Sequence, residues 1–279
     1  MKERNLKYHI NWKGAWKEMR NERMKKLKIS YDKEFFLKYA DGFSKRGKFN
    51  DYEFGRKSVE ILNNILDHNS EVLEIGSGPG TITIPLARTA KKIVCIEFNE
   101  LNIKYLNANL KENNLDNVEV INQNWNKIND EEIKNKFDLV YCSHFLWQIE
   151  DPVILLKRME NASRKYCAII QPCGRDDIIK EIFEKVSNQK YTGQFEPDAD
   201  YFVYIILREW GRLVKLRYFK YTLEMNIEEY LIYVSSFIGK FVTIDVVVKE
   251  KIKDYLLEKS ENGKFTKIDN AIVMWWAIK

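Results

Sequence analysis

A glycine-rich segment in the first third of the chain is the feature best suited to chemistry. It follows a short apolar run and reads Glu74-Ile-Gly76-Ser77-Gly78-Pro-Gly80. Glycines let the backbone turn tightly and let a ligand approach it closely, and a loop that feeds a helix presents free N–H groups. The third glycine comes one residue earlier than in the dinucleotide pattern G-x-G-x-x-G, where this chain has Thr81. No Gly-Lys-Ser/Thr follows, which excludes a P-loop.

An acidic residue at the end of the next apolar run is the second candidate. Glu97 lies about twenty residues after the loop, at the distance where nucleotide-binding folds place a ribose ligand. Its two carboxylate oxygens can accept both ribose hydroxyls, and Phe98 is expected to lie against adenine. Dehydrogenases share this arrangement, so Glu97 indicates adenosine without choosing the cofactor. The alternative is a solvated acid at a strand end.

These motifs resemble those of the class I S-adenosylmethionine-dependent methyltransferases, in particular the small-molecule type. Their E/D-x-G-x-G-x-G motif matches residues 74–80, and the resemblance covers residues 52–175. It implies S-adenosyl-L-methionine as cofactor and S-adenosyl-L-homocysteine as product. It also implies a Rossmann-like α/β three-layer sandwich. The seven-stranded sheet would be mostly parallel with an antiparallel last strand, and a helical cap would precede it. The residues that it assigns to the cofactor site so far are Glu74, Gly76, Ser77, Gly78, Gly80, Glu97 and Phe98.

The resemblance extends to three later positions. The Asn124 position usually holds Asp in this family, where it binds the adenine amino group, and the Asn carbonyl oxygen can accept the same bond. Trp125 beside it could stack on adenine or be a core tryptophan. Ser143 follows the fourth apolar run, where the family's loop reaches the sulfonium and the substrate.

The reaction that the resemblance implies is an in-line displacement, which depends mainly on orientation. Orientation of this kind can supply about 7–11 kcal/mol. A base helps only when the nucleophile carries a proton, and no metal-ligand cluster stands out. His144, one of three histidines, falls on the loop expected to face the substrate and is the best base candidate. The alternative is a histidine that caps or packs.

The elements that must position these residues follow from the apolar pattern. Short apolar runs alternate with helical stretches, which predicts right-handed crossovers and a parallel sheet. A late alternating run and a final apolar run would complete the sheet. The expected strands are Glu71–Ile75, Lys92–Phe98, Val118–Asn122, Phe137–Cys142, Tyr166–Gln171, Leu213–Leu223 and Phe265–Ile278. We expect one domain of 1–279, with a cofactor-binding core over 70–175 and a C-terminal part over 176–279 that carries a helical insertion at 227–260.

Residues 1–69 are expected to form a helical cap that acts as a lid. Trp12 and Trp16 could share a helix face, a helix should start near Ser30, and Asp41-Gly42 and Gly47 to Asp51 predict breaks. The resemblance implies that an aromatic residue or an arginine of the cap meets the methionine carboxylate. The candidates are Tyr31, Tyr39, Arg46 and Tyr52. The aromatic stretches Trp12/Trp16 and Tyr201–Trp210 could wall a pocket or simply pack.

The composition of the chain bears on its binding partners and on its cellular compartment. The 279 residues include 46 Lys+Arg and 41 Asp+Glu, a net charge of +5 spread without a basic block, which is weak support for nucleic acid. The four cysteines lack metal or disulfide spacing and fit a reducing cytoplasm. The N-terminus has no apolar signal region, and no apolar run approaches the roughly 20 residues of a bilayer span.

The sequence therefore predicts methyl transfer to a small or medium-sized, partly apolar acceptor. Two motifs of base methyltransferases are missing or misplaced, because no Asn/Asp-Pro-Pro-aromatic motif follows the fourth run and Pro172-Cys173 follows the fifth. RNA or protein methylation and a non-catalytic adenosyl-ligand scaffold stay as alternatives. A nicotinamide oxidoreductase is the weakest alternative, because the third glycine of the loop is misplaced for a dinucleotide. A thiophilic acceptor held by Cys142 and Cys173 is a side hypothesis.

Overall fold

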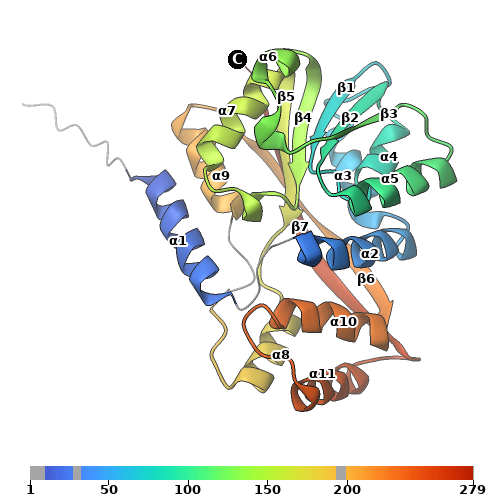
Figure 1. The fold of residues 1–279 in the computed structure, drawn as a ribbon. Helices are drawn as coiled ribbons and strands as arrows, with labels where there is room; N and C mark the ends of the chain where they lie inside the picture. Colours follow the sequence, from blue (N-terminus) through green and yellow to red (C-terminus); the bar gives the residue numbers. More distant parts are fainter. Residues whose placement is uncertain (1–9, 28–32, 193–198, 279) are drawn as a thin grey trace, which may run out of the picture.

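Seven strands form a single sheet in the order β3-β2-β1-β4-β5-β7-β6 (Figure 1). The structure is a computed structural model that describes residues 10–27, 33–192 and 199–278. The strands are β1 (Glu71–Ile75), β2 (Lys92–Glu97), β3 (Val118–Asn122), β4 (Phe137–Ser143), β5 (Ser163–Pro172), β6 (Lys215–Asn226) and β7 (Lys264–Ala277). The first five pair in parallel, and β7 runs antiparallel to both β5 and β6. The predicted fold class is confirmed.

Helices cover both faces of the sheet because its central strands are apolar on both sides, as buried parallel strands usually are. Successive strand residues point to opposite faces, so Leu73 and Ile75 join one core and Val72 joins the other. The first core is covered by α6 (Asp130–Ile133), α7 (Pro152–Ala162) and α9 (Ala199–Glu209), and the second by α3 (Glu53–Leu62), α4 (Thr83–Ala87) and α5 (Glu100–Glu112).

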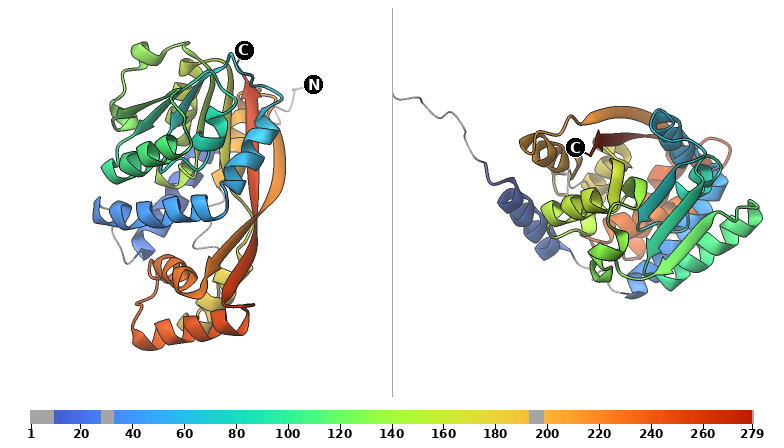
Figure 2. Two further views of the ribbon diagram at one scale, coloured as in Figure 1. Left: turned by 90° about the vertical axis from the view of Figure 1, so that its right-hand side faces the viewer. Right: turned by 90° about the horizontal axis from the view of Figure 1, so that it is seen from above.

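A third core lies beyond the sheet, where the β6–β7 hairpin extends past the other strands (Figure 2). It contains α8 (Asp177–Ser187), α10 (Ile227–Ile238) and α11 (Val246–Glu258). The last two helices are the predicted insertion at 227–260, divided in two. Within the described ranges, no helix combines the length and apolar character that a membrane span requires.

Helix α1 (Trp12–Lys26) packs on α9 through aromatic residues. Trp12 and Trp16 lie on one face, as predicted, and their rings contact Phe202 at centroid distances of 6.2 and 5.6 Å. The Trp16 indole donates to the carbonyl of Ile149 at 3.1 Å. The two aromatic stretches therefore pack on each other, as the packing alternative expects.

Helix α2 (Lys33–Phe49) corrects one prediction, because it continues through Asp41-Gly42. The Asp41 carboxylate accepts from the Tyr105 hydroxyl at 2.7 Å and pairs with Lys45 at 2.9 Å. These partners use the side chain that would otherwise favour a helix end. The break after Gly47 is confirmed at Phe49, and the expected start at Ser30 lies outside the described residues.

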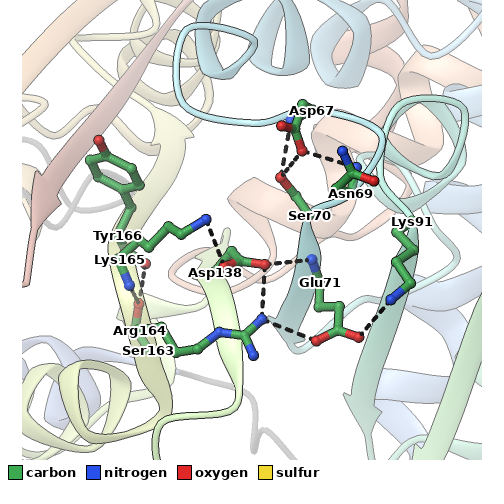
Figure 3. Close-up of polar contacts among 10 residues, drawn as sticks. All are labelled: Asp67, Asn69, Ser70, Glu71, Lys91, Asp138, Ser163, Arg164, Lys165 and Tyr166. Atoms are coloured by element: carbon green, nitrogen blue, oxygen red, sulfur yellow. Dashed lines mark hydrogen bonds and ion pairs between the residues drawn. The ribbon is translucent and has the colours of Figure 1, made fainter.

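A polar cluster joins the amino ends of β1, β4 and β5 (Figure 3). The glycine loop follows the opposite, carboxyl end of β1. Asp138 of β4 accepts from the backbone N–H of Glu71 at 3.0 Å and pairs with Arg164 and Lys165 of β5 at 2.9 and 3.1 Å. Arg164 also reaches the Glu71 carboxylate at 3.0 Å. The buried carboxylate of Asp138 thus helps to align β1, β4 and β5.

We expect Asp138→Asn to lower the free energy of unfolding by about 1–3 kcal/mol at neutral pH. Burial opposes ionisation, but the Glu71 N–H and the two cations lower the pKa of Asp138 below its usual range. A lowered pKa adds stability at neutral pH that is lost as the pH falls through it. In urea unfolding, the difference in free energy of unfolding between wild type and Asp138→Asn should therefore become smaller at acid pH. Exposed Asp116→Asn is the control, and equal effects of both variants would contradict the assignment.

Candidate active site

Two glycines of the loop between β1 and α4 are required by the protein's own packing. Gly76 has φ of +73°, and a Cβ there would lie 2.8 Å from the Phe145 ring. Gly80 has φ of +96°, and a Cβ there would lie 2.7 Å from Leu106. The Gly76 N–H donates to the carbonyl of Ile96 at 2.8 Å, which joins the loop to β2.

The middle glycine faces open space instead. Gly78 has φ of +55°, and no heavy atom lies within 4 Å of the position that a Cβ would take. Its N–H donates to the Glu97 carboxylate at 2.9 Å. This is the close, unobstructed approach to backbone that a bound ligand needs, beside an acid.

Glu97 lies at the junction of the loop and β2. One carboxylate oxygen accepts from the N–H groups of Phe98 and Asn99 at 2.9 and 2.8 Å, and the other accepts from Gly78. Burial raises the pKa of Glu97, although the hydrogen bonds from these three backbone N–H groups act to lower it. A carboxylate has about four acceptor positions, of which three take these backbone N–H groups, and the Asn102 side chain also acts on Glu97. Phe98 is 43% exposed beside it. This donor and acceptor set fits an adenosine.

Glu74 and Ser77, in and next to the glycine loop, have buried side chains. Glu74 is 1% exposed and accepts from the Thr83 hydroxyl of α4 at 2.5 Å. Burial raises its pKa to about 7. The Ser77 hydroxyl is buried without a hydrogen-bond partner in the described structure, and its carbonyl accepts from Gly80 at 3.1 Å. Both residues stay predicted members of the cofactor site, and their side chains are buried in this structure.

After β3, the two predicted adenine residues have different surroundings. Half-buried Asn124 caps a short 3-10 turn by accepting from Asn126 at 2.8 Å, which leaves the second lone pair of its amide oxygen. Trp125 is 4% exposed, and the Arg158 guanidinium lies 4.3 Å from its ring centroid. The burial of Trp125 favours the core alternative, and its stacking on adenine stays a prediction.

The structure describes the side chains of only some of the cap residues that were candidates for contact with the cofactor. Tyr52 is buried against Gly47, and its hydroxyl is influenced by Glu112 and Asn113 at the far end of α5. Its contact with the cofactor stays a prediction. Tyr31 lies outside the described residues, and only the backbone of Tyr39 is described.

Ser143 and His144 lie at the carboxyl end of β4. The Ser143 hydroxyl lies 2.9 Å from His144 Nδ1, and the His144 N–H donates to the carbonyl of Ile170 at 3.1 Å. His144 has φ of +52°, a strained backbone that often marks functional sites. Its ring contacts Phe54 and Phe43 at centroid distances of 4.8 and 6.1 Å.

These surroundings keep the His144 ring neutral. Burial, and secondly the charge of Arg46, lower the pKa of His144 to about 4. The ring therefore has an acceptor nitrogen at neutral pH, although it is a weak base. The packed ring agrees with a histidine that only packs, and the acceptor nitrogen agrees with a catalytic base. Both alternatives raised by the sequence therefore stay open.

The thiol hypothesis fails on access. Cys142 is fully buried, and burial raises the pKa of its thiol. Cys173, which is half-buried, has a raised pKa of about 12 for the same reason. Within the described chain, these two cysteines do not present a pair of accessible, reactive thiols.

The sequence did not reveal how α2 covers the glycine loop. The Asn109 amide of α5 donates to the carbonyl of Pro79 at 2.8 Å and to the Ser44 hydroxyl of α2 at 3.3 Å. One asparagine therefore joins loop, α5 and α2. The sequence shows Asn109 only as one polar residue of a predicted helix, so this connection could not be recognised from the sequence.

Comparison with known proteins identifies the family. A methyltransferase domain model matches residues 66–220, more than half of the 279 residues. The chain therefore belongs to this methyltransferase-domain family.

Individual relatives agree on the class. Ribosomal RNA small subunit methyltransferase A of Staphylococcus aureus is 34% identical over 107 residues, 35% of each chain. The tRNA/tmRNA (uracil-C(5))-methyltransferase of Nitratiruptor is 26% identical over 211 residues, 66% of this chain and 54% of that one. The chain thus spans about a third to a half of these curated relatives. A SAM-dependent methyltransferase structure from Aquifex aeolicus shares the fold, with a TM-score of 0.50, 18% identity and coverage of 85% and 98%.

We expect Gly78→Ala to reduce affinity for S-adenosyl-L-homocysteine at least tenfold, because the new methyl group would enter the space left for the ligand. The change also costs about 1–2 kcal/mol of stability at positive φ. Gly263→Ala is the matched control, since Gly263 has φ of +74° with no atom within 4 Å of its Cβ position and lies in the distant β7 turn. Calorimetric titration of both folded variants measures the difference. Equal affinities would refute the role of Gly78.

Proposed function

We propose that this methyltransferase acts on a small or medium-sized, partly apolar acceptor at the carboxyl end of β4. The observation that carries the proposal is the aromatic enclosure of His144 by rings from two cap helices. An enclosed apolar site is typical of small-molecule recognition. S-adenosylmethionine, when bound, supplies an electrophilic methyl group on a sulfonium.

The enclosure continues onto the β6–β7 hairpin. Phe54, which contacts His144, also contacts Phe219 and Tyr221 of β6 at centroid distances of 5.6 and 5.0 Å. Rings from α2, α3 and β6 thus surround the tip of β4. Such rings would bind an apolar acceptor body and exclude water.

Charge pairing reduces the number of cations that α2 offers to RNA. Lys45 pairs with Asp41 at 2.9 Å and Lys48 pairs with Glu112 at 2.6 Å, which leaves Arg46 as the cation without such a pair between residues 40 and 49 of the helix. Strong RNA binding needs cations that are free to contact phosphates. The names of the relatives keep RNA as the second candidate acceptor.

The proposed cofactor contacts are Gly78, Glu97, Phe98 and Asn124, with Ser143 at the junction with the acceptor. The chain's main contribution would be alignment of the nucleophile with the methyl group. His144 Nε2, with Nδ1 beside the Ser143 hydroxyl, would accept a proton if the nucleophile carries one. Helix α2 would act as the cover of the site.

Transfer from isotopically labelled S-adenosylmethionine tests the acceptor class. The purified protein should label the dialysable fraction of a cell extract and leave total RNA unlabelled at physiological salt. A Glu97→Ala variant should label neither. Label in RNA that disappears after nuclease treatment would contradict the small-molecule proposal and favour the second candidate.

We expect His144→Ala to lower kcat about 10²-fold while the Kd for S-adenosyl-L-homocysteine stays the same. The wild-type profile should show no ionisation of this group between about pH 5.5 and 8, since its pKa is about 4. His68→Ala, at an exposed histidine before β1, is the matched control. Unchanged turnover in the His144 variant would leave the ring with a packing role only.

A further inference from the structure

Helix α2 has two functionally distinct faces. One face bonds to the cofactor-binding core through Asp41, Ser44 and Lys48, which contact α5. Phe43 and Arg46, three residues apart and therefore neighbours on a helix, lie on the other face. They contact His144 and α10 instead.

Arg46 is held in place by two aromatic rings. Its guanidinium carbon lies 4.5 Å from the Phe43 ring centroid and 4.8 Å from that of Tyr233 on α10. In the described part of the chain, no carboxylate lies within ion-pair distance of Arg46, whereas Lys45 and Lys48 on the same helix are paired. Cation–π contacts of this kind give about 0.5–2 kcal/mol and leave the N–H donors available.

A buried lysine of the same region, Lys267, is already neutralised. Lys267 of β7 is 6% exposed and pairs with Asp269 at 2.7 Å and with Asp176, the N-cap of α8. Lys267 therefore links the hairpin to α8. The positive charge of Arg46 acts on His144, and no ion pair of Arg46 with a carboxylate is found among the described residues.

We propose that Arg46 binds a carboxylate or phosphate group of the acceptor, whose apolar body lies against the rings around His144. The planar guanidinium fork matches both anions in two-point geometry. The inference rests on the proposed function and narrows its acceptor to a small acid with an aromatic or branched apolar body. The cofactor's own carboxylate has the same chemistry and is the competing source of the anion.

The test uses the full chain saturated with S-adenosyl-L-homocysteine and titrated with benzoate, with neutral benzamide as the comparison probe. Wild type should bind benzoate in preference to benzamide. Arg46→Gln should lose at least tenfold in benzoate affinity, and Arg46→Lys should fall between the two. Lys45→Gln, a neighbouring charge loss at an ion-paired lysine, should behave like wild type.

Two results would overturn the inference. One is benzoate binding that is absent, no stronger than benzamide binding, or equal in Arg46→Gln. The other is an Arg46→Gln variant that loses affinity for S-adenosyl-L-homocysteine but keeps it for 5′-methylthioadenosine, which lacks the carboxylate. Because these are binding measurements, failure here is separate from failure of methyl transfer to small molecules, which the labelling experiment measures.

Discussion

The carboxylate of Glu97 is the interaction on which the rest of the site depends. It accepts hydrogen bonds from Gly78 in the loop after β1 and from Phe98 and Asn99 after β2. Two segments from adjacent strands are therefore held by one side chain. A buried acid is costly unless its oxygens are satisfied, so the loop and the strand end must keep this arrangement. The ligand space beside Gly78 follows from it.

A second constraint is the position of α2 between the two halves of the site. Asn109 joins the helix to the glycine loop through Ser44 and Pro79, while Phe43 and Arg46 extend toward β4 and α10. In the proposed site, cofactor and acceptor sides would thus share one helix. Arg46 also contacts Tyr233 of α10, which lies in a part of the chain beyond the family match at 66–220.

Much of this fold could be predicted because buried parallel strands are apolar on both faces and stand out as short runs. Gly78 and Glu97 could be identified because their residue types are needed for a close approach and for paired acceptors. The orientation of Glu74, Trp125 and Tyr52 could not be predicted. Each is positioned by partners distant in sequence, such as the Arg158 guanidinium over Trp125. The helix through Asp41-Gly42 has the same cause, since Tyr105 of α5 satisfies the aspartate.

The most direct test of the central claim is calorimetric titration with S-adenosyl-L-homocysteine, with NAD as the control ligand and Glu97→Ala as the second sample. The account predicts micromolar binding of S-adenosyl-L-homocysteine alone, lost in a variant that still folds. Undiminished binding by the folded variant would contradict it, and so would preferential binding of NAD, because the Glu97-centred loop would then not be the adenosyl site that the structure indicates.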